Sequence, residues 1–193
     1  MKKLNAALFF SAVLAPNLAL AHSDHDATSM LSGLAAGALH PLLGLDHLLT
    51  LLLVGGLASQ LQGVERWSVV LSFVGLMALG FFSAHAGVHA ISTGAVEALI
   101  SASLVVGAFL MMMGQLAKRY LTKTTLFSSL SAWGMTGFAI FHGFAHGLEI
   151  PVGSALSGFS VGFLVMSASL ITVGIGLGIK VFVERKLPRL NSL

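Results

Sequence analysis

Two short stretches of the sequence place histidines and carboxylates within segments that are otherwise apolar. The first is HPLLGLDH at residues 40–47, and the second is HGFAHGLEIP at residues 142–151. Residues three and four apart lie on one face of a helix, so His142, His146 and Glu149 form a single stripe if the helix continues. Imidazole and carboxylate groups suit a borderline divalent cation such as Ni(II), Co(II), Zn(II) or Cu(II). Because ionisable groups inside a membrane are costly, we expect these to serve a function.

The candidate metal ligands form two sets. The first comes from the two motifs and consists of His40, Asp46, His47, His142, His146 and Glu149. The second lies outside them and consists of His22, His25, His85, His89 and Glu97. His85 and His89 share a helical face, provided Gly87 does not end the helix between them. Simpler interpretations stay open, such as interhelical hydrogen bonds of about 0.6 kcal/mol each, a wetted helix end or an unstructured polar leader.

The elements that must position these groups are membrane helices. Of the 193 residues, 56% are hydrophobic and 9% are charged, which is typical of integral membrane proteins. Long apolar runs cover residues 30–60, 67–86, 92–116, 126–147 and 157–183. Each run can cross a bilayer, which takes about 20 helical residues. We therefore predict an all-α integral membrane protein, with a compact bundle of about five transmembrane helices over residues 30–183.

The ends of the chain and its loops predict an orientation. Residues 1–21 resemble a cleavable signal peptide, because Lys2 and Lys3 precede an apolar run and a small-residue site ends at Ala21. The loops are alternately basic and free of Lys and Arg, as the positive-inside rule requires. We therefore predict a His/Asp tail at 22–29 outside the cytoplasm, which is the periplasm in a bacterium with two membranes, and a basic cytoplasmic tail at 184–193. An odd number of spans fits both ends.

The first apolar run is too long for one straight span, because its 31 residues would cover about 46 Å against about 30 Å of hydrocarbon. Pro41 and Gly44 predict a break at His40–Pro41, beside Asp46 and His47. In the predicted orientation every histidine lies outside or in the outer half of the membrane, which argues against purely structural roles. The second motif would lie at the outer mouth and the first motif deeper, as successive stations of one inward path.

Pairs of small residues predict close helix contacts. The pairs are Gly143 with Gly147 and Gly158 with Gly162, each four residues apart within an apolar run. Such pairs allow two membrane helices to approach closely. We expect them to serve assembly and not chemistry.

The two motifs carry a resemblance to a known family. HPLLGLDHLLTLLLVGGLA resembles the first signature of the HupE/UreJ family, HGFAHGLEIP its second, and VEALISASLVVGAFL its glutamate-bearing middle helix. The similarity covers nearly the whole mature chain. It implies a permease for nickel or cobalt uptake in the bacterial inner membrane, which supplies hydrogenase or urease maturation. By position, the resemblance assigns His40, Asp46 and His47 to the first motif, and His142, His146 and Glu149 to the second.

The sequence constrains how such transport would be driven. It has no GxxxxGK[ST] phosphate loop, so we expect no ATP hydrolysis in this polypeptide and no tightly bound cofactor. The membrane potential supplies about 4.6 kcal/mol per 100 mV for a divalent cation, a concentration ratio of about 2,000. That suffices for uptake of Ni²⁺ or Co²⁺ without a pump.

Other classes of protein are weighed against transport. An intramembrane zinc hydrolase could use the HxxxH spacing, but Gly143 stands where the catalytic glutamate of HExxH would follow His142. A haem-binding bundle could use paired histidines. Without Lys2 and Lys3, eight Lys and Arg remain against seven Asp and Glu, a charge of about +1 that predicts no nucleic-acid partner. The expected partners are a divalent metal ion and the lipid bilayer, and homo-oligomerisation stays open.

Overall fold

The computed structural model describes residues 29–88, 91–120, 124–150 and 155–182, and within these ranges all regular structure is α-helical. The helices are α2 (Met30–Leu43), α3 (Leu45–Ala58), α4 (Gly63–His85), α5 (Thr93–Tyr120), α6 (Thr125–Thr136), α7 (Ala139–Leu148) and α8 (Leu156–Phe182). They cover all five apolar runs, so the all-helical prediction is confirmed. The predicted signal peptide, the cytoplasmic tail at 184–193, His22, His25 and His89 lie outside the described residues.

Three helices of the described chain are long and apolar enough to cross a membrane. They are α4, α5 over Thr93–Lys118 and α8 over Leu156–Lys180. The pair α2 and α3 meets the same criteria jointly, as a broken span or a re-entrant loop bent by 81°. With 12 and 10 residues, α6 and α7 are each shorter than a bilayer requires. The chain is thus a multi-pass membrane protein, and a fifth span remains a prediction that depends on joining α6 to α7.

The first apolar run breaks at Gly44. The predicted break at His40–Pro41 is therefore wrong. Helix α2 includes Pro41 and ends at Leu43, and Gly44 is extended with φ −82° and ψ 107°. Proline removes a single amide donor, so the following turn keeps its bond from Gly44 N to His40 O at 3.4 Å. A β-carbon at Gly44 would lie 3.0 Å from Nδ1 of His47. The chain therefore turns where glycine leaves room for the first side chains of α3.

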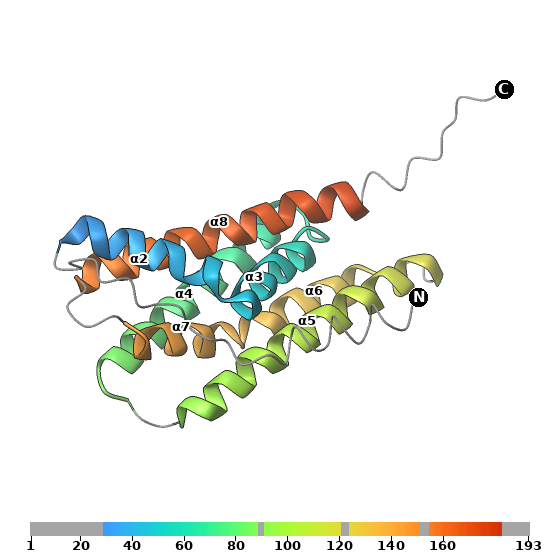
Figure 1. Cartoon of the computed structure of the whole chain (residues 1–193). Helices are drawn as coiled ribbons and strands as arrows, with labels where there is room; N and C mark the ends of the chain where they lie inside the picture. Colours follow the sequence, from blue (N-terminus) through green and yellow to red (C-terminus); the bar gives the residue numbers. More distant parts are fainter. Residues whose placement is uncertain (1–28, 89–90, 121–123, 151–154, 183–193) are drawn as a thin grey trace, which may run out of the picture.

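The fourth apolar run is interrupted but not bent sharply. Both linking residues keep helical dihedral angles, with φ −60° and ψ −30° at Gly137 and φ −76° and ψ −16° at Phe138. The backbone amides there bond three residues back, from Phe138 N to Met135 O at 3.1 Å. This tighter turn leads α6 into α7 in nearly the same direction (Figure 1).

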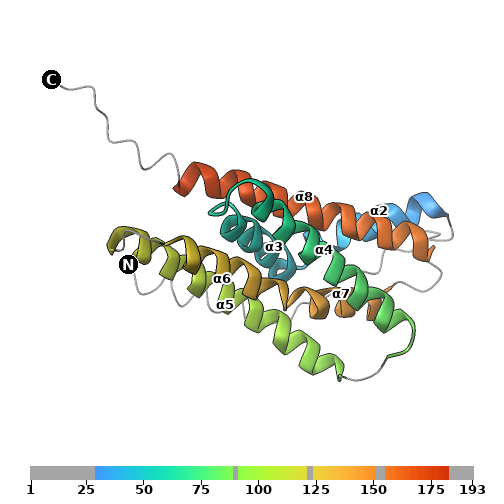
Figure 2. The same cartoon turned by 180° about the vertical axis from the view of Figure 1, so that it is seen from behind.

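The helices pack in parallel pairs. Helices α2 and α3 lie one after the other along α8, and α7 lies along α4 (Figure 1). Seen from behind, α5 and α6 lie on the side of the bundle away from α8 (Figure 2). Gly37 lies against Phe159 and Gly55 against Ile171, so α2 and α3 run in the direction of α8. Parallel packing of the first with the last apolar run is the arrangement expected when an odd number of crossings lies between them.

Glycines make these helix contacts possible. A β-carbon at Gly80 of α4 would overlap the carbonyl oxygen of Ile140, at the end of α7 nearest α6. Other glycines whose β-carbon would meet the backbone of a facing helix at 2.8 Å or less are Gly33, Gly37, Gly55, Gly143, Gly147, Gly158, Gly162 and Gly174. The predicted role of the pairs Gly143 with Gly147 and Gly158 with Gly162 in close packing is therefore confirmed.

A pair of alanine substitutions in α4 tests this packing. Gly80→Ala should destabilise the protein by about 1–3 kcal/mol, because the new methyl group forces α4 and α7 apart. Gly75→Ala is the matched control, since nothing lies within 4 Å of a β-carbon there. Alanine favours a helix over glycine by about 0.5–1 kcal/mol, so this variant should be as stable as the wild type or more so. Thermal unfolding in detergent measures both, and equal midpoints for the two variants would contradict the proposed contact.

Candidate metal centre

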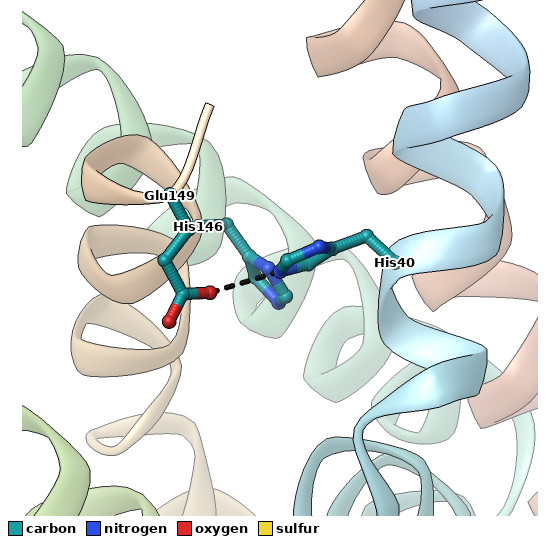
Figure 3. A group of neighbouring side chains, drawn as sticks. All are labelled: His40, His146 and Glu149. Atoms are coloured by element: carbon teal, nitrogen blue, oxygen red, sulfur yellow. Dashed lines mark hydrogen bonds and ion pairs between the residues drawn. The ribbon is translucent and has the colours of Figure 1, made fainter. Parts of the chain in front are cut away.

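The bend after α2 and the end of α7 bring the two motifs together. His40 projects from α2 toward His146 and Glu149, which both come from the end of α7 (Figure 3). Nε2 of His40 lies 2.9 Å from Oε2 of Glu149, and the ring centroids of His40 and His146 are 4.7 Å apart. One ligand atom from each of these three residues lies within 4.8 Å of the other two. The three side chains are therefore close enough to bind one cation.

The contacts continue from this outer group into the bundle. The ring centroid of His47, in the first turn of α3, lies 4.6 Å from the ring centroid of His146 and 5.3 Å from that of His142. Asp46 joins the group through His47, since Oδ1 of Asp46 lies 3.0 Å from Nδ1 of His47. We call these six residues the histidine cluster: His40, Asp46, His47, His142, His146 and Glu149.

The members of the histidine cluster differ in exposure, and Glu149, His40, Asp46 and His47 are partly exposed whereas His142 and His146 are fully buried. The side chain of Glu149 is 45% exposed and that of His40 is 23% exposed. His47 is 12% exposed, and His142 and His146 are 0% exposed. A small cation could therefore pass from an accessible carboxylate to fully buried imidazoles without leaving the reach of a ligand.

Hydrogen bonds fix the direction in which two of the rings face. Nδ1 of His47 donates to Asp46, whose same oxygen also accepts from the backbone amide of His47 at 2.9 Å. Nδ1 of His142 donates to the carbonyl oxygen of Phe138 at 3.2 Å, at the interruption between α6 and α7. A bond at Nδ1 leaves the lone pair of Nε2 free, which is how proteins orient metal-binding imidazoles. Asp46 thus orients the ring of His47, and the carbonyl group of Phe138 orients the ring of His142.

Several ring nitrogens are buried without a hydrogen-bond partner in the described part of the chain. These atoms are Nε2 of His47, Nε2 of His142 and both ring nitrogens of His146. An unsatisfied buried polar group costs about 1–3 kcal/mol. Four such atoms in one place are not explained by packing. A cation would satisfy the lone pairs of Nε2 of His47, Nε2 of His142 and one ring nitrogen of His146, while the other nitrogen of His146 carries a proton.

Aromatic residues of α8 and α4 line the histidine cluster. The ring centroid of Phe163 lies 4.5 Å from that of His146, and that of Phe159 lies 5.8 Å from that of His40. Phe73 of α4 lies 6.2 Å from His142. These rings exclude lipid and bulk water, which strengthens electrostatic interactions within the cluster.

The structure places the predicted site residues in two groups. All six motif residues meet in one cluster. The outer pair, His40 and Glu149, takes one residue from each motif, and so does the inner pair, His47 and His142. The predicted order of stations, with the second motif outside and the first motif deeper, therefore differs from the geometry. The other described candidates lie apart: His85 is exposed at the end of α4, Gly87 with φ +82° ends that helix, and Glu97 is exposed on α5.

Sequence reasoning did not identify the surroundings of the predicted ligands. The carbonyl oxygen of Phe138 orients His142, and Phe159 and Phe163 shield the rings. A backbone carbonyl gives no signal in sequence beyond the nearby Gly134 and Gly137. Phenylalanines in an apolar helix resemble ordinary core residues.

The cost of the unpartnered nitrogens can be tested without metal. His146→Leu replaces a buried ring, both of whose nitrogens lack a partner, by an apolar side chain. We expect its unfolding midpoint in detergent with chelator to equal or exceed that of the wild type. Phe81→Leu is the comparison, because Phe81 is fully buried among apolar neighbours and its truncation leaves a cavity that should lower the midpoint. A lower midpoint for His146→Leu than for Phe81→Leu would show that His146 is a structural residue.

Comparison with known proteins places the chain among its relatives. The model of the family described as HupE / UreJ protein matches residues 10–191. A protein named Protein HupE, from Rhizobium leguminosarum bv. viciae, is 33% identical over 178 residues, which covers 92% of this chain and 84% of that protein. No solved structure matches. With both motifs inside the matched region and nearly all of the chain covered, this protein belongs to the HupE/UreJ family.

Proposed function

We propose that this protein is an inner-membrane permease for uptake of a divalent transition metal, nickel or cobalt, in support of hydrogenase or urease maturation. The observation that carries the proposal is the continuous row of ligand groups from exposed Glu149 to buried His142. A single closed site would suit a resident metal, whereas a row that spans a range of depth suits a cation in transit. Membership of the HupE/UreJ family supports the same role.

The outer end of the histidine cluster is suited to capture. Glu149 and His40 are the accessible pair, and together with His146 they offer one carboxylate and two imidazoles. Nickel and cobalt accept this mixture of nitrogen and oxygen ligands. The cluster contains two carboxylates, Asp46 and Glu149, so with neutral imidazoles its formal charge of −2 balances a divalent cation. The cation can then enter the bundle without an uncompensated charge.

Transfer inward uses His146 as the shared residue. Its ring centroid lies 4.7 Å from that of His40 and 4.6 Å from that of His47, so the two imidazoles nearest to it belong to the outer and inner parts of the cluster. The cation exchanges the outer ligands for Nε2 of His47 and Nε2 of His142 while it loses water. Because these ligands are spread over several residues, no one cage binds it too tightly for release.

The distribution of charge supports the predicted orientation. Among the described residues, Arg66, Lys118 and Lys180 lie at the start of α4, the end of α5 and the end of α8. Glu149 lies at the opposite end, where α7 ends and α8 follows. An excess of basic residues marks the cytoplasmic side, so the accessible end of the cluster faces the periplasm. The inside-negative membrane potential then drives the cation inward.

Uptake of labelled nickel and cobalt by cells that express the protein tests the proposal. His146→Ala removes the shared imidazole and should reduce the initial rate at least tenfold, to that of cells without the protein. Asp46→Ala frees the ring of His47 and should reduce the rate severalfold. All rates are compared at matched amounts of protein in the membrane.

The control is His85→Ala, which removes an exposed imidazole at the same end of the bundle but outside the cluster. Its uptake should stay within twofold of the wild type. Unchanged uptake in both cluster variants would disprove the proposed path. If wild-type cells take up no more metal than empty cells, the transport function itself is wrong.

A further inference from the structure

Two buried hydroxyl groups have no place in the path described so far. Thr50 on α3 and Ser167 on α8 are both 0% exposed. Within the part of the chain that the structure describes, neither Oγ1 of Thr50 nor Oγ of Ser167 has a hydrogen-bond partner. The remaining atoms in this condition are ring nitrogens of the histidine cluster. The two hydroxyls thus share an unusual property with the proposed ligands.

Four other buried hydroxyls of the described chain are satisfied by carbonyl groups of the preceding turn. Ser59, Ser103, Thr136 and Ser160 each donate to a backbone carbonyl three residues earlier, at distances of 2.6, 2.6, 2.6 and 3.2 Å. Thr50 and Ser167 lie within helices that offer the same carbonyls. Since they do not use these acceptors, their oxygen and hydrogen atoms remain available for another group.

Both hydroxyls lie one turn farther along their helices than a residue that belongs to the histidine cluster or packs on it. Thr50 follows His47 by three residues on α3, so it shares a face with that ring and lies about 4.5 Å farther along the helix. Ser167 follows Phe163 by four residues on α8, and Phe163 packs on His146 at 4.5 Å between ring centroids. Helices α3 and α8 run in parallel and touch one turn farther on, where Gly55 meets Ile171. The two residues therefore lie on the inward side of the cluster.

We propose that Thr50 and Ser167 form an oxygen-only station, where a divalent cation leaves the histidine cluster on its way to the cytoplasm. This inference rests on the proposed transport function. The hydroxyls accept hydrogen bonds from the water molecules that the cation regains, and they donate hydrogen bonds to further water. Neutral hydroxyl oxygens bind a borderline cation more weakly than imidazole does. A weak station after a stronger one favours release and not retention.

Valine and alanine substitutions separate this role from a structural one. Thr50→Val and Ser167→Ala remove the hydroxyls and change little in volume. In proteoliposomes with an inside-negative potential, the double variant should transport labelled nickel at least tenfold more slowly than the wild type. Equilibrium nickel binding to the purified full-length protein in detergent should stay within twofold, because the histidine cluster is intact. His146→Ala should instead lose both binding and transport.

Thermal unfolding separates this role from a structural one, because loss of a structural hydroxyl would lower the unfolding midpoint. Because the two hydroxyls have no partner, the double variant should unfold at the wild-type midpoint or above it. Thr50→Ser keeps a hydroxyl and should transport at close to the wild-type rate. Ser103→Ala is the matched control, since Ser103 is equally buried but bonded to the carbonyl of Ile100, and its transport should not change.

The outcomes distinguish the two proposals. Wild-type transport together with an equally fast double variant would overturn the oxygen-only station and leave the permease standing. A double variant that loses nickel binding in proportion to transport would also overturn it, because the hydroxyls would then belong to the histidine cluster or to its packing. An absence of transport by the wild type would remove both proposals.

Discussion

Backbone contact between helices at glycines is the constraint on which the rest of the structure depends. Helix α2 lies against α8 and α7 against α4 because glycines face the neighbouring backbone at each crossing. In a bilayer, close packing of this kind replaces the hydrophobic effect as the source of helix association. It also fixes the site, since His40 is carried by α2 and His146 by α7. Without those contacts the imidazoles would have neither their mutual distances nor the phenylalanines that shield them.

Much of the fold could be predicted from composition and periodicity. Apolar runs located every described helix, and the motifs named all six residues of the histidine cluster. The position of the break could not be predicted, because proline inside α2 removes one hydrogen bond without ending the helix, while Gly44 ends it. The interruption at Gly137 was not predicted either. The dihedral angles there stay helical, and the apolar run in the sequence continues through this position.

The arrangement of the candidate site was less predictable than its membership. Spacing along a helix places His142 and His146 on one face, but it says nothing about which residue of the other motif each one meets. Those pairings depend on the 81° bend between α2 and α3 and on the crossing of distant helices. Thr50 and Ser167 gave no signal in sequence, because hydroxyl residues in membrane helices are usually satisfied by their own backbone.

The phenylalanines that shield the histidine cluster come from the last described helix, long after its ligands in the chain. Phe159 and Phe163 belong to α8, whereas the last residue of the cluster along the chain is Glu149. The chain is synthesised from its N-terminus, so every imidazole of the cluster is made before the phenylalanines of α8 that cover it. Until α8 enters the bilayer, polar side chains of α2 face lipid or another protein. The order of elements along the chain therefore makes completion of the proposed metal path one of the last events of its biogenesis.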